Sequence, residues 1–386
     1  MKTDDYKKDI EGYAEVQKEI EICRKYGIDY TIEKGKIAQI INRLHPPKLR
    51  LKVSEIRKET PSTTTFRLVS QDNYLPPFQA GQYISLSVEI GRVRTSRPYS
   101  ISSPPNQLGF YDITVRRLEN GFVSNYLLDE VNVGDIFETS SPLGYFYYNP
   151  LFHGNDLVFL AGGSGITPFM SMIRKVTDCG LKRRIHLIYG SQFLDDVIFH
   201  EELTYREKYH DNFTYTLVIS NPPQGYKGST GFITTDLIRD TVDDIASKTF
   251  YICGPEGMYD FCLPELEKLE IPKRRIREEL IGPPKDVLSD PGWPKDVTPD
   301  AEFSVRVTGG KTITARATEP LISSLEREGI VIPAFCRSGA CSSCRVKLLS
   351  GKVFQPKGVW LRKSDRQFGY IHACLAYPLK DLEIMI

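Results

Sequence analysis

The sequence predicts a chain of several domains, in which an antiparallel β-barrel, a parallel α/β domain and a further strand-rich domain follow one another. Two changes of hydrophobic period support this fold class. Short runs in which apolar and polar residues alternate begin at Leu49, and from Asp156 they give way to apolar runs separated by helix-length segments. The third observation is the length of 386 residues, which is too long for one ordinary domain.

The first 48 residues are expected to form a helical extension. Apolar residues recur there at three- and four-residue steps, in one segment with Tyr6, Ile10, Tyr13, Ile20 and Cys23 and in a second with Ile37, Ile40, Ile41 and Leu44. Gly27 is the expected end of the first helix, and two prolines at 46 and 47 end the second. Two roles stay open: a cap that packs on the barrel, which we favour, or an element for docking or self-association.

Residues 49–150 carry the alternating runs of the barrel, separated by Gly and Pro turns. Residues 151–282 carry four apolar runs with helix-length segments between them, which is typical of a parallel sheet covered by helices. Residues 283–300 are rich in proline and are predicted to form a stiff linker. Residues 301–386 return to strands, with one helix expected near residues 320–327.

A cysteine loop in the last domain carries the strongest chemical signal. Its spacing is C-x4-C-x2-C with a distant fourth cysteine, and the four residues are Cys336, Cys341, Cys344 and Cys374. This is the ligand pattern of a plant-type [2Fe–2S] cluster. Small residues between the first three allow backbone N–H groups to approach the sulfurs. A structural zinc site, which more often has two C-x2-C pairs, is the minor alternative.

Two motifs in the barrel region have the residue types that a flavin requires. The first is Arg97-Pro98-Tyr99-Ser100, where an Arg can neutralise a phosphate, a Tyr ring can cover a flavin face and a Ser hydroxyl can reach a ring nitrogen. The second comprises Gly121, Val123 and Ser124 at the start of a helix, where free N–H groups suit a pyrophosphate. Taken singly, each also fits an ordinary turn.

Two further motifs follow strands of the α/β region. A glycine-rich turn comes directly after the apolar run 157–161, and its candidate binding residues are Gly163, Gly165, Thr167 and Pro168. Glycines permit close approach to a phosphate, and the proline suits the first turn of a helix whose dipole favours an anion. Cys253, Gly254 and Pro255 follow another apolar run, which places a thiol in the usual binding crevice of a parallel sheet. A buried inert cysteine is the alternative.

In this order, the five motifs resemble the ferredoxin–NADP⁺ reductase superfamily fused to a plant-type ferredoxin. The resemblance covers about residues 49–386 and is nearest to the reductase components of multicomponent oxygenases. It implies a C-terminal β-grasp domain and a flavin held by residues 97–100, with Ser100 near N5. It also implies that Cys253 lies against the nicotinamide ring. The residue corresponding to the family's acidic group near the flavin is Glu278, and the neighbouring Glu279 stays open because Leu280 replaces the usual aromatic residue.

The choice of cofactors follows from the same resemblance. The family uses FAD or, in one branch, FMN, and an aromatic run at residues 145–148 that can stack an adenine favours FAD. A 2′-phosphate needs cationic partners beyond the second and third strands of the sheet. Ser191-Gln192 and Ser220-Asn221 supply none there, although Lys227 could partly compensate, so NADH is favoured over NADPH.

A converter of electron pairs into single electrons is the function that this domain order implies. Nicotinamide delivers two electrons together, a flavin releases them singly, and a [2Fe–2S] cluster carries one. We therefore expect an NAD(P)H-dependent reductase that serves a partner metalloenzyme or oxygenase. Arg337 and Arg345 are expected on an exposed rim facing that partner, or simply in solvent. Reverse flow from a low-potential donor and a redox-sensing binding module are the alternatives.

The composition and the N-terminal sequence limit the partners and the cellular compartment that we expect. The formal net charge is +1, which does not favour nucleic acid or an anionic membrane. No apolar run approaches the roughly 20 residues that span a bilayer, and the N-terminus lacks the apolar core of a signal peptide. The four other cysteines are scattered without a disulfide framework. We expect a cytoplasmic protein.

Overall fold

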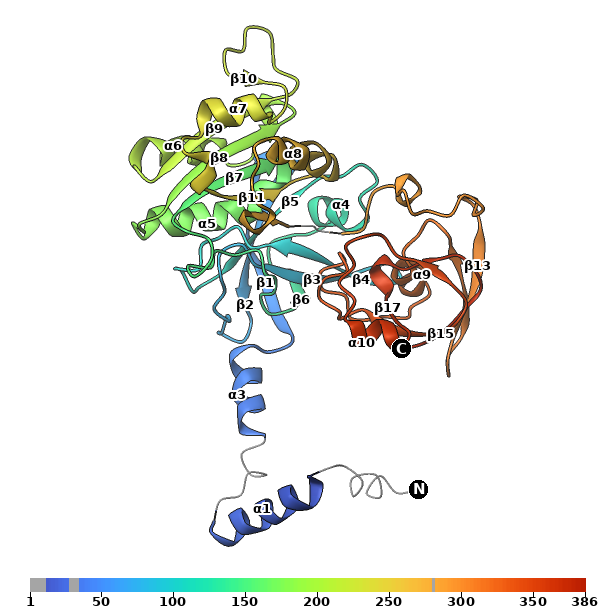
Figure 1. Ribbon diagram of the computed structural model, residues 1–386. Coiled ribbons are helices and arrows are strands. Elements are labelled where there is room, and N and C mark those ends of the chain that lie inside the picture. Colours follow the sequence, from blue (N-terminus) through green and yellow to red (C-terminus); the bar gives the residue numbers. More distant parts are fainter. Residues whose placement is uncertain (1–11, 28–34, 280–281) are drawn as a thin grey trace. The chain divides into compact units, whose positions relative to one another are not determined.

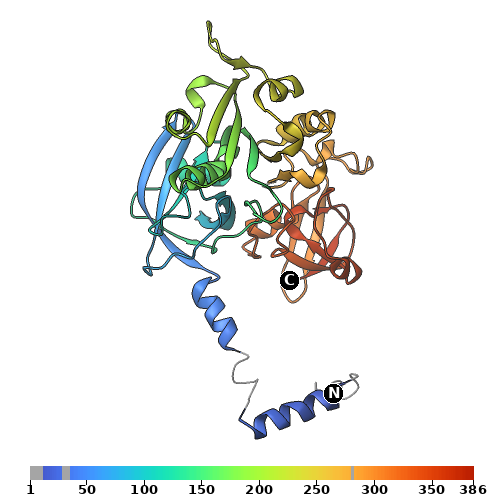
Figure 2. The ribbon, with the colours of Figure 1, turned by 60° about the vertical axis from the view of Figure 1, so that its left-hand side comes forward.

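The computed structural model describes residues 12–27, 35–279 and 282–386, and the chain divides into two compact units, Met1–Pro47 and Lys48–Ile386 (Figures 1 and 2). The first unit contains the helices α1 (Tyr13–Lys25) and α3 (Lys36–Leu44). The two predicted helices are therefore confirmed, although Tyr6 and Ile10 lie outside the described residues. The apolar stripe of α3 is exposed, and the role of this unit stays a prediction.

The second unit begins with a six-stranded antiparallel sheet in the order β4-β3-β6-β1-β2-β5. Its strands are β1 (Leu49–Thr60), β2 (Thr63–Ser70), β3 (Tyr83–Ile90), β4 (Val93–Ser100), β5 (Tyr111–Arg116) and β6 (Ile136–Thr139). Alternate residues such as Leu51, Val53 and Ile113 point into one core, as the period-2 pattern requires. The helix α4 (Phe122–Asp129) joins β5 to β6. The predicted flavin-domain barrel is confirmed.

A parallel sheet follows, in the order β10-β9-β8-β7-β11-β12. Its strands are β7 (Asp156–Gly162), β8 (Arg184–Ser191), β9 (Phe213–Ile219), β10 (Ser229–Thr230), β11 (Thr249–Cys253) and β12 (Ile276–Glu278). Its helices are α5 (Ile166–Asp178), α6 (His200–Tyr209), α7 (Thr235–Thr241) and α8 (Glu256–Lys268). Successive residues of β7 face two different cores, Phe159 one and Val158 the other, so the strands are apolar on both faces.

The C-terminal domain is a five-stranded mixed sheet in the order β14-β13-β19-β15-β17. The strands are β13 (Glu302–Val307), β14 (Thr312–Arg316), β15 (Arg345–Ser350), β17 (Tyr370–His372) and β19 (Leu382–Met385), beside a short pair of β16 (Val353–Phe354) and β18 (Tyr377–Pro378). The predicted helix is α9 (Leu321–Arg327), and α10 (Lys363–Gln367) lies before β17. Cys344 and Cys374 belong to this domain's core.

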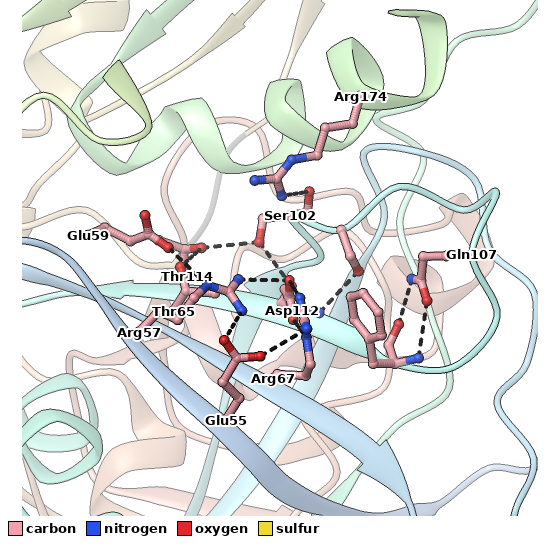
Figure 3. A network of polar contacts seen from close by, with 12 residues as sticks. Glu55, Arg57, Glu59, Thr65, Arg67, Ser102, Gln107, Asp112, Thr114 and Arg174 are labelled. Carbon is pink, nitrogen blue, oxygen red and sulfur yellow. Dashed lines mark hydrogen bonds and ion pairs between the residues drawn. The ribbon is translucent and has the colours of Figure 1, made fainter. Parts of the chain in front are cut away.

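A polar network joins the barrel to the α/β domain (Figure 3). The buried carboxylate of Asp112 accepts from Arg57 at 3.0 Å and from Arg67 at 2.9 and 3.0 Å, which ties β5 to β1 and β2. The Nη1 of Arg174 on α5 then donates to the carbonyl of Ser102 at 2.8 Å. Helix α5 begins at the glycine-rich turn, so these contacts help to fix that turn against the barrel. Among the described residues, no helix has both the length and the hydropathy of a membrane span.

Candidate functional site

The Arg-Pro-Tyr-Ser motif occupies the end of β4. Pro98 and Ser100 are buried, and Arg97 and Tyr99 are half-buried. Burial raises the pKa of the Tyr99 phenol, which therefore stays neutral. Burial, followed by the positive charge of Arg337, lowers the pKa of the Arg97 guanidinium to about 10, so Arg97 remains a cation at neutral pH. A half-buried cation beside a buried hydroxyl suits the phosphate and the ring of a flavin.

Tyr83 of β3 lies next to the flavin motif. It pairs directly with Ser100 across β3 and β4. Burial is the main cause that raises the pKa of the Tyr83 phenol, and the negative charges of Cys336, Cys341 and Glu279 raise it further. The same two strands hold the cysteine loop, because Ser85 of β3 and Ser96 of β4 both donate to the carbonyl of Ala334, at 3.4 and 2.8 Å. The flavin motif and the cysteine loop therefore meet at β3 and β4. No sequence motif had indicated Tyr83.

Gly121, Val123 and Ser124 lie where predicted, at the N-terminus of α4. Gly121 is the extended residue before the helix, and a Cβ there would come within 2.2 Å of the Ser124 hydroxyl oxygen. Val123 and Ser124 are buried. The first N–H groups of a helix have no partner within it, so this end suits an anionic group.

The glycine-rich turn makes a tight passage from β7 to α5. Gly163 has a φ of +51°, and a Cβ on Gly165 would lie 2.1 Å from the Cys253 carbonyl oxygen. Only glycine permits that approach of turn to strand. Thr167 stabilises the turn by donating to the carbonyl of Ser164 at 2.7 Å, and Pro168 lies in the first turn of α5, as predicted.

Arg116 brings a cation to this turn and was missed by the sequence reasoning. It ends β5 of the barrel, and a Cβ on Gly163 would lie 2.5 Å from its Nη1. Its Nη2 is bonded to Asp196 at 2.5 Å. A guanidinium beside a glycine turn is suited to a phosphate group. Residue 116 belongs to a different domain from the turn, so no local pattern could reveal the pairing.

Cys253 ends β11, next to Ala161 of β7, and only 4% of its surface is exposed. Burial raises the pKa of its thiol, and the charge of Glu279 adds to the effect, so the thiol is protonated at neutral pH. Gly254 follows, with its N–H bonded to the Tyr259 hydroxyl at 3.3 Å, and Pro255 precedes α8. The neutral thiol therefore lines the crevice and lacks the reactivity of a thiolate.

Glu279 and Glu278 have different surroundings. Glu278 ends β12 and is exposed, whereas Glu279 is partly buried and its backbone N–H bonds to the carbonyl of Ile252 at 3.2 Å. Burial raises the pKa of the Glu279 carboxyl to about 8. Glu279 is also tied to the Cys253 turn, because its carbonyl accepts from the Tyr259 hydroxyl, which in turn accepts from the N–H of Gly254. The role predicted for Glu278 stays a prediction. Glu279, the alternative, has the more suitable environment for holding a proton, because burial raises its pKa.

The four cysteines form two thiol pairs. Cys336 interacts with Cys341, and Cys344 with Cys374. Hydrogen bonding from Cys336, followed by that from Ser343, lowers the pKa of Cys341 to about 4. Within the described ranges, no three His, Cys, Asp or Glu side chains gather as around a single metal ion. Two pairs of sulfurs suit two irons, so the donor set fits a [2Fe–2S] cluster.

Backbone groups of the loop are also suited to that cluster. The N–H groups of Ser338 and Cys341 lie 3.4 and 3.3 Å from the Cys336 sulfur. Cys374 arrives from the turn after β17, and the N–H of Ala373 bonds to the Cys344 carbonyl at 3.0 Å. N–H groups directed at sulfur stabilise thiolates and tune a cluster's potential.

The cysteine loop is anchored on the barrel. The Ser96 hydroxyl donates to the carbonyl of Ala334 at 2.8 Å. Arg337 is bonded to Thr95 of β4 at 2.9 Å and to Glu326 of α9. Only 4% of the Arg337 surface is exposed, so its predicted place on an outer rim is wrong. Its charge is instead neutralised inside the contact between domains. Arg345 is more accessible and bonds to Asp365 at 2.7 Å.

Family models match three successive parts of the chain. They are the oxidoreductase FAD-binding domain at residues 48–148, the oxidoreductase NAD-binding domain at 159–263 and the 2Fe-2S iron-sulfur cluster binding domain at 305–379. The chain is 31% identical over 336 residues to NADH oxidoreductase HCR of Escherichia coli, with 86% of this chain and 96% of the relative covered. It is 28% identical to the glycine betaine monooxygenase reductase subunit of Pseudomonas aeruginosa, covering 86% and 93%.

A solved structure shares the fold over nearly the same length. Phthalate dioxygenase reductase, described as a modular structure for electron transfer from pyridine nucleotides to [2Fe-2S], superposes with a TM-score of 0.63 and 24% identity. The alignment covers 88% of this chain and 97% of that one. The likeness supports the arrangement of the three successive sheets.

Proposed function

Because the chain belongs to the ferredoxin–NADP⁺ reductase superfamily, in the branch with a C-terminal plant-type ferredoxin domain, we propose that it serves as the reductase component of a multicomponent oxygenase system. It is an NADH-dependent oxidoreductase that passes electrons through FAD and a [2Fe–2S] cluster to a protein partner. When bound, FAD exchanges an electron pair from nicotinamide for single electrons, which the cluster carries one at a time.

The contact between the flavin motif and the cysteine loop carries this proposal. Ser100 ends β4, the strand whose Ser96 donates to the carbonyl of Ala334 at 2.8 Å and whose Thr95 accepts from Arg337 at 2.9 Å. In our proposal Ser100 orients the flavin ring, while Cys253 excludes water beside the nicotinamide and Glu279 holds a proton at that place. Arg97 and the α4 N-terminus bind the flavin phosphates. Because β4 bonds directly to the cysteine loop, the proposed flavin and cluster sites lie in adjoining domains, which suits electron transfer within one chain.

The nucleotide is held, in this proposal, by the turn at Gly163–Gly165 and by the guanidinium of Arg116. NADH is preferred because the carboxyl ends of β8 and β9 carry Ser191-Gln192 and Ser220-Asn221, without the arginines that a 2′-phosphate requires. The proposed division of the chain is a helical extension at 1–48, flavin binding at 49–150, nucleotide binding at 151–282, a linker at 283–300 and the cluster domain at 301–386.

We place the protein in the cytoplasm, where its eight cysteines, all free of disulfides, remain reduced. The test of function is anaerobic mixing with NADH and, separately, NADPH, followed by flavin absorbance and cluster EPR. Bleaching of the flavin and then a reduced-cluster signal with NADH are expected. If neither nucleotide reduces a fully loaded protein, reverse flow or a redox-sensing module replaces the proposal. A response to NADPH alone would overturn only the nucleotide preference.

A further inference from the structure

The segment between β15 and β17, residues 351–369, differs in charge from the rest of the chain. It contains five exposed cations, Lys352, Lys357, Arg362, Lys363 and Arg366, and a single acid, Asp365. The acid is buried and bonded to Arg345. None of the five cations has an ion-pair partner in the part of the chain that the structure describes. A formal charge of +4 thus lies on this short segment, whereas the whole chain carries +1.

Large apolar side chains lie among these charges. Trp360 is 69% exposed and Phe368 is 62% exposed. A groove of about 450 Å³ is lined by other residues of this segment, among them Lys357, Val359 and Arg366. The Nε2 atom of Gln355, which also lines it, is buried without a hydrogen-bond partner among the described residues. Exposed aromatic side chains surrounded by charged residues are typical of protein interfaces. The unpaired N–H of Gln355 could donate to an oxygen of a partner.

This segment contacts the cysteine loop directly. The N–H of Trp360 donates to the carbonyl of Gly339 at 3.1 Å. A Cβ on Gly339 would lie 3.3 Å from the Cγ1 of Val359, so the segment covers the loop closely at that glycine. Ala334 and Arg337, elsewhere in the loop, are held by the barrel. A second protein that collects an electron must therefore approach the cluster away from the barrel contact.

We propose that the Trp360 surface, formed by Trp360, Phe368, Lys357, Arg362, Lys363 and Arg366, docks an acidic electron-acceptor protein. This inference rests on the proposed function, to which it adds the surface and the charge of the partner. Cations steer an acidic partner during encounter, and the aromatic rings supply the apolar contact once water is expelled. A membrane would also attract cations and a tryptophan, but the bond from Trp360 to the loop that carries the cluster ligands favours a redox partner.

Cytochrome b5, an acidic haem protein, and cytochrome c, a basic one, are suitable probes. The loaded full-length protein and its Arg362→Glu/Lys363→Glu variant are compared by interferometry for Kd at low salt, and by NADH-driven reduction of each cytochrome. The Lys182→Glu/Lys208→Glu variant is the matched control, because it makes the same charge change at exposed positions of the α/β domain. Reduction by the Cys341→Ser variant is subtracted, since it reports electrons that bypass the cluster.

The charge-reversed variant is expected to bind cytochrome b5 roughly tenfold more weakly, with a flatter salt dependence and faster reduction of cytochrome c. The Trp360→Ala variant is expected to weaken binding at high salt as well as low. The proposal would be overturned if the control variant weakened cytochrome b5 binding as much as the charge-reversed variant, or if no variant of the Trp360 surface changed that binding. It would also be overturned if these variants lost binding to phosphatidylserine vesicles while their Kd for cytochrome b5 stayed the same. Because cluster EPR with NADH is recorded for every variant, failure of the reductase function itself would be seen separately.

Discussion

Arg337 of the cysteine loop donates to the hydroxyl of Thr95 on β4, with 2.9 Å between Nη2 and Oγ1. The same hydroxyl accepts from Arg97 at 2.7 Å and donates to the Glu326 carboxylate at 2.9 Å. Its two acceptor sites and single proton are thus all used. Through this one buried atom, the arginine of the flavin motif and the residue next to Cys336 are held in a fixed relation.

Replacement of Thr95 by valine is expected to loosen that relation. The variant keeps the side-chain shape but leaves two guanidinium groups and a carboxylate without a shared partner, at a cost of about 1–3 kcal/mol in the free energy of unfolding. Reduction of the cluster by the flavin should slow more than reduction of the flavin by NADH. Stopped-flow absorbance and thermal unfolding measure the two effects. The control is Thr312→Val on an exposed strand position, and equal behaviour of both variants would contradict the assignment.

The three sheets could be predicted from the sequence because each depends on the local period of apolar residues, while the cluster ligands stay a prediction from the cysteine spacing. Sequence reasoning failed where residues meet across domains. Arg337 lies in a loop that its sequence would place at the surface. It is buried because it bonds to Thr95 and Glu326, which no local pattern connects to it. Arg116 reaches the glycine turn from another domain for the same reason. The choice between Glu278 and Glu279 depended on how β12 pairs with β11, which no motif encodes.

The Cys253→Ala variant is expected to slow reduction of the flavin by NADH roughly tenfold, because the cavity lets water and nicotinamide shift beside the ring. Cluster content should not change. The matched control is Cys262→Ala, which removes another buried thiol of the same domain on α8. Both variants lose stability, so only the rate of flavin reduction distinguishes them. If flavin reduction were equally fast in the Cys253→Ala and Cys262→Ala variants, Cys253 would have only a packing role.

The Cys341→Ser variant is expected to lose the cluster EPR signal while NADH still bleaches the flavin. A hydroxyl cannot replace the thiolate that the neighbouring Cys336 and Ser343 favour at this position. Iron and sulfide analysis, flavin absorbance and EPR check the outcome. The exposed Cys179→Ser serves as the control. Loss of flavin reduction together with the cluster would argue against independent steps in the two domains.

The Asp112→Asn variant tests the network that ties the barrel together (Figure 3). Asp112 is 2% exposed and pairs with both Arg57 and Arg67, so removal of its charge leaves two cations partly unpaired. A loss of about 2 kcal/mol in the free energy of unfolding is expected. Urea titration of the apoprotein measures it. The exposed pair of Lys311 and Glu328 provides the control, since Glu328→Gln should change stability little.

Glu279 links stability to pH. In the unfolded chain its carboxyl ionises near its ordinary value of 4.5, whereas burial raises its pKa in the folded protein to about 8. Between these values the folded state holds a proton that the unfolded state has released. The contribution of Glu279 to stability is therefore complete below pH 4.5 and is lost as the pH rises toward 8.

The Glu279→Gln variant keeps a neutral side chain at every pH and should abolish this loss. Relative to the wild type, the apoprotein of the variant is expected to gain stability steadily from pH 5 to about 8, because only the wild type must bury a charge or take up a proton there. Urea unfolding across that range measures the difference, with Glu267→Gln on the exposed side of α8 as control. A constant difference between wild type and Glu279→Gln would mean that Glu279 is already ionised when the protein is folded at neutral pH, and it could then not hold a proton beside Cys253.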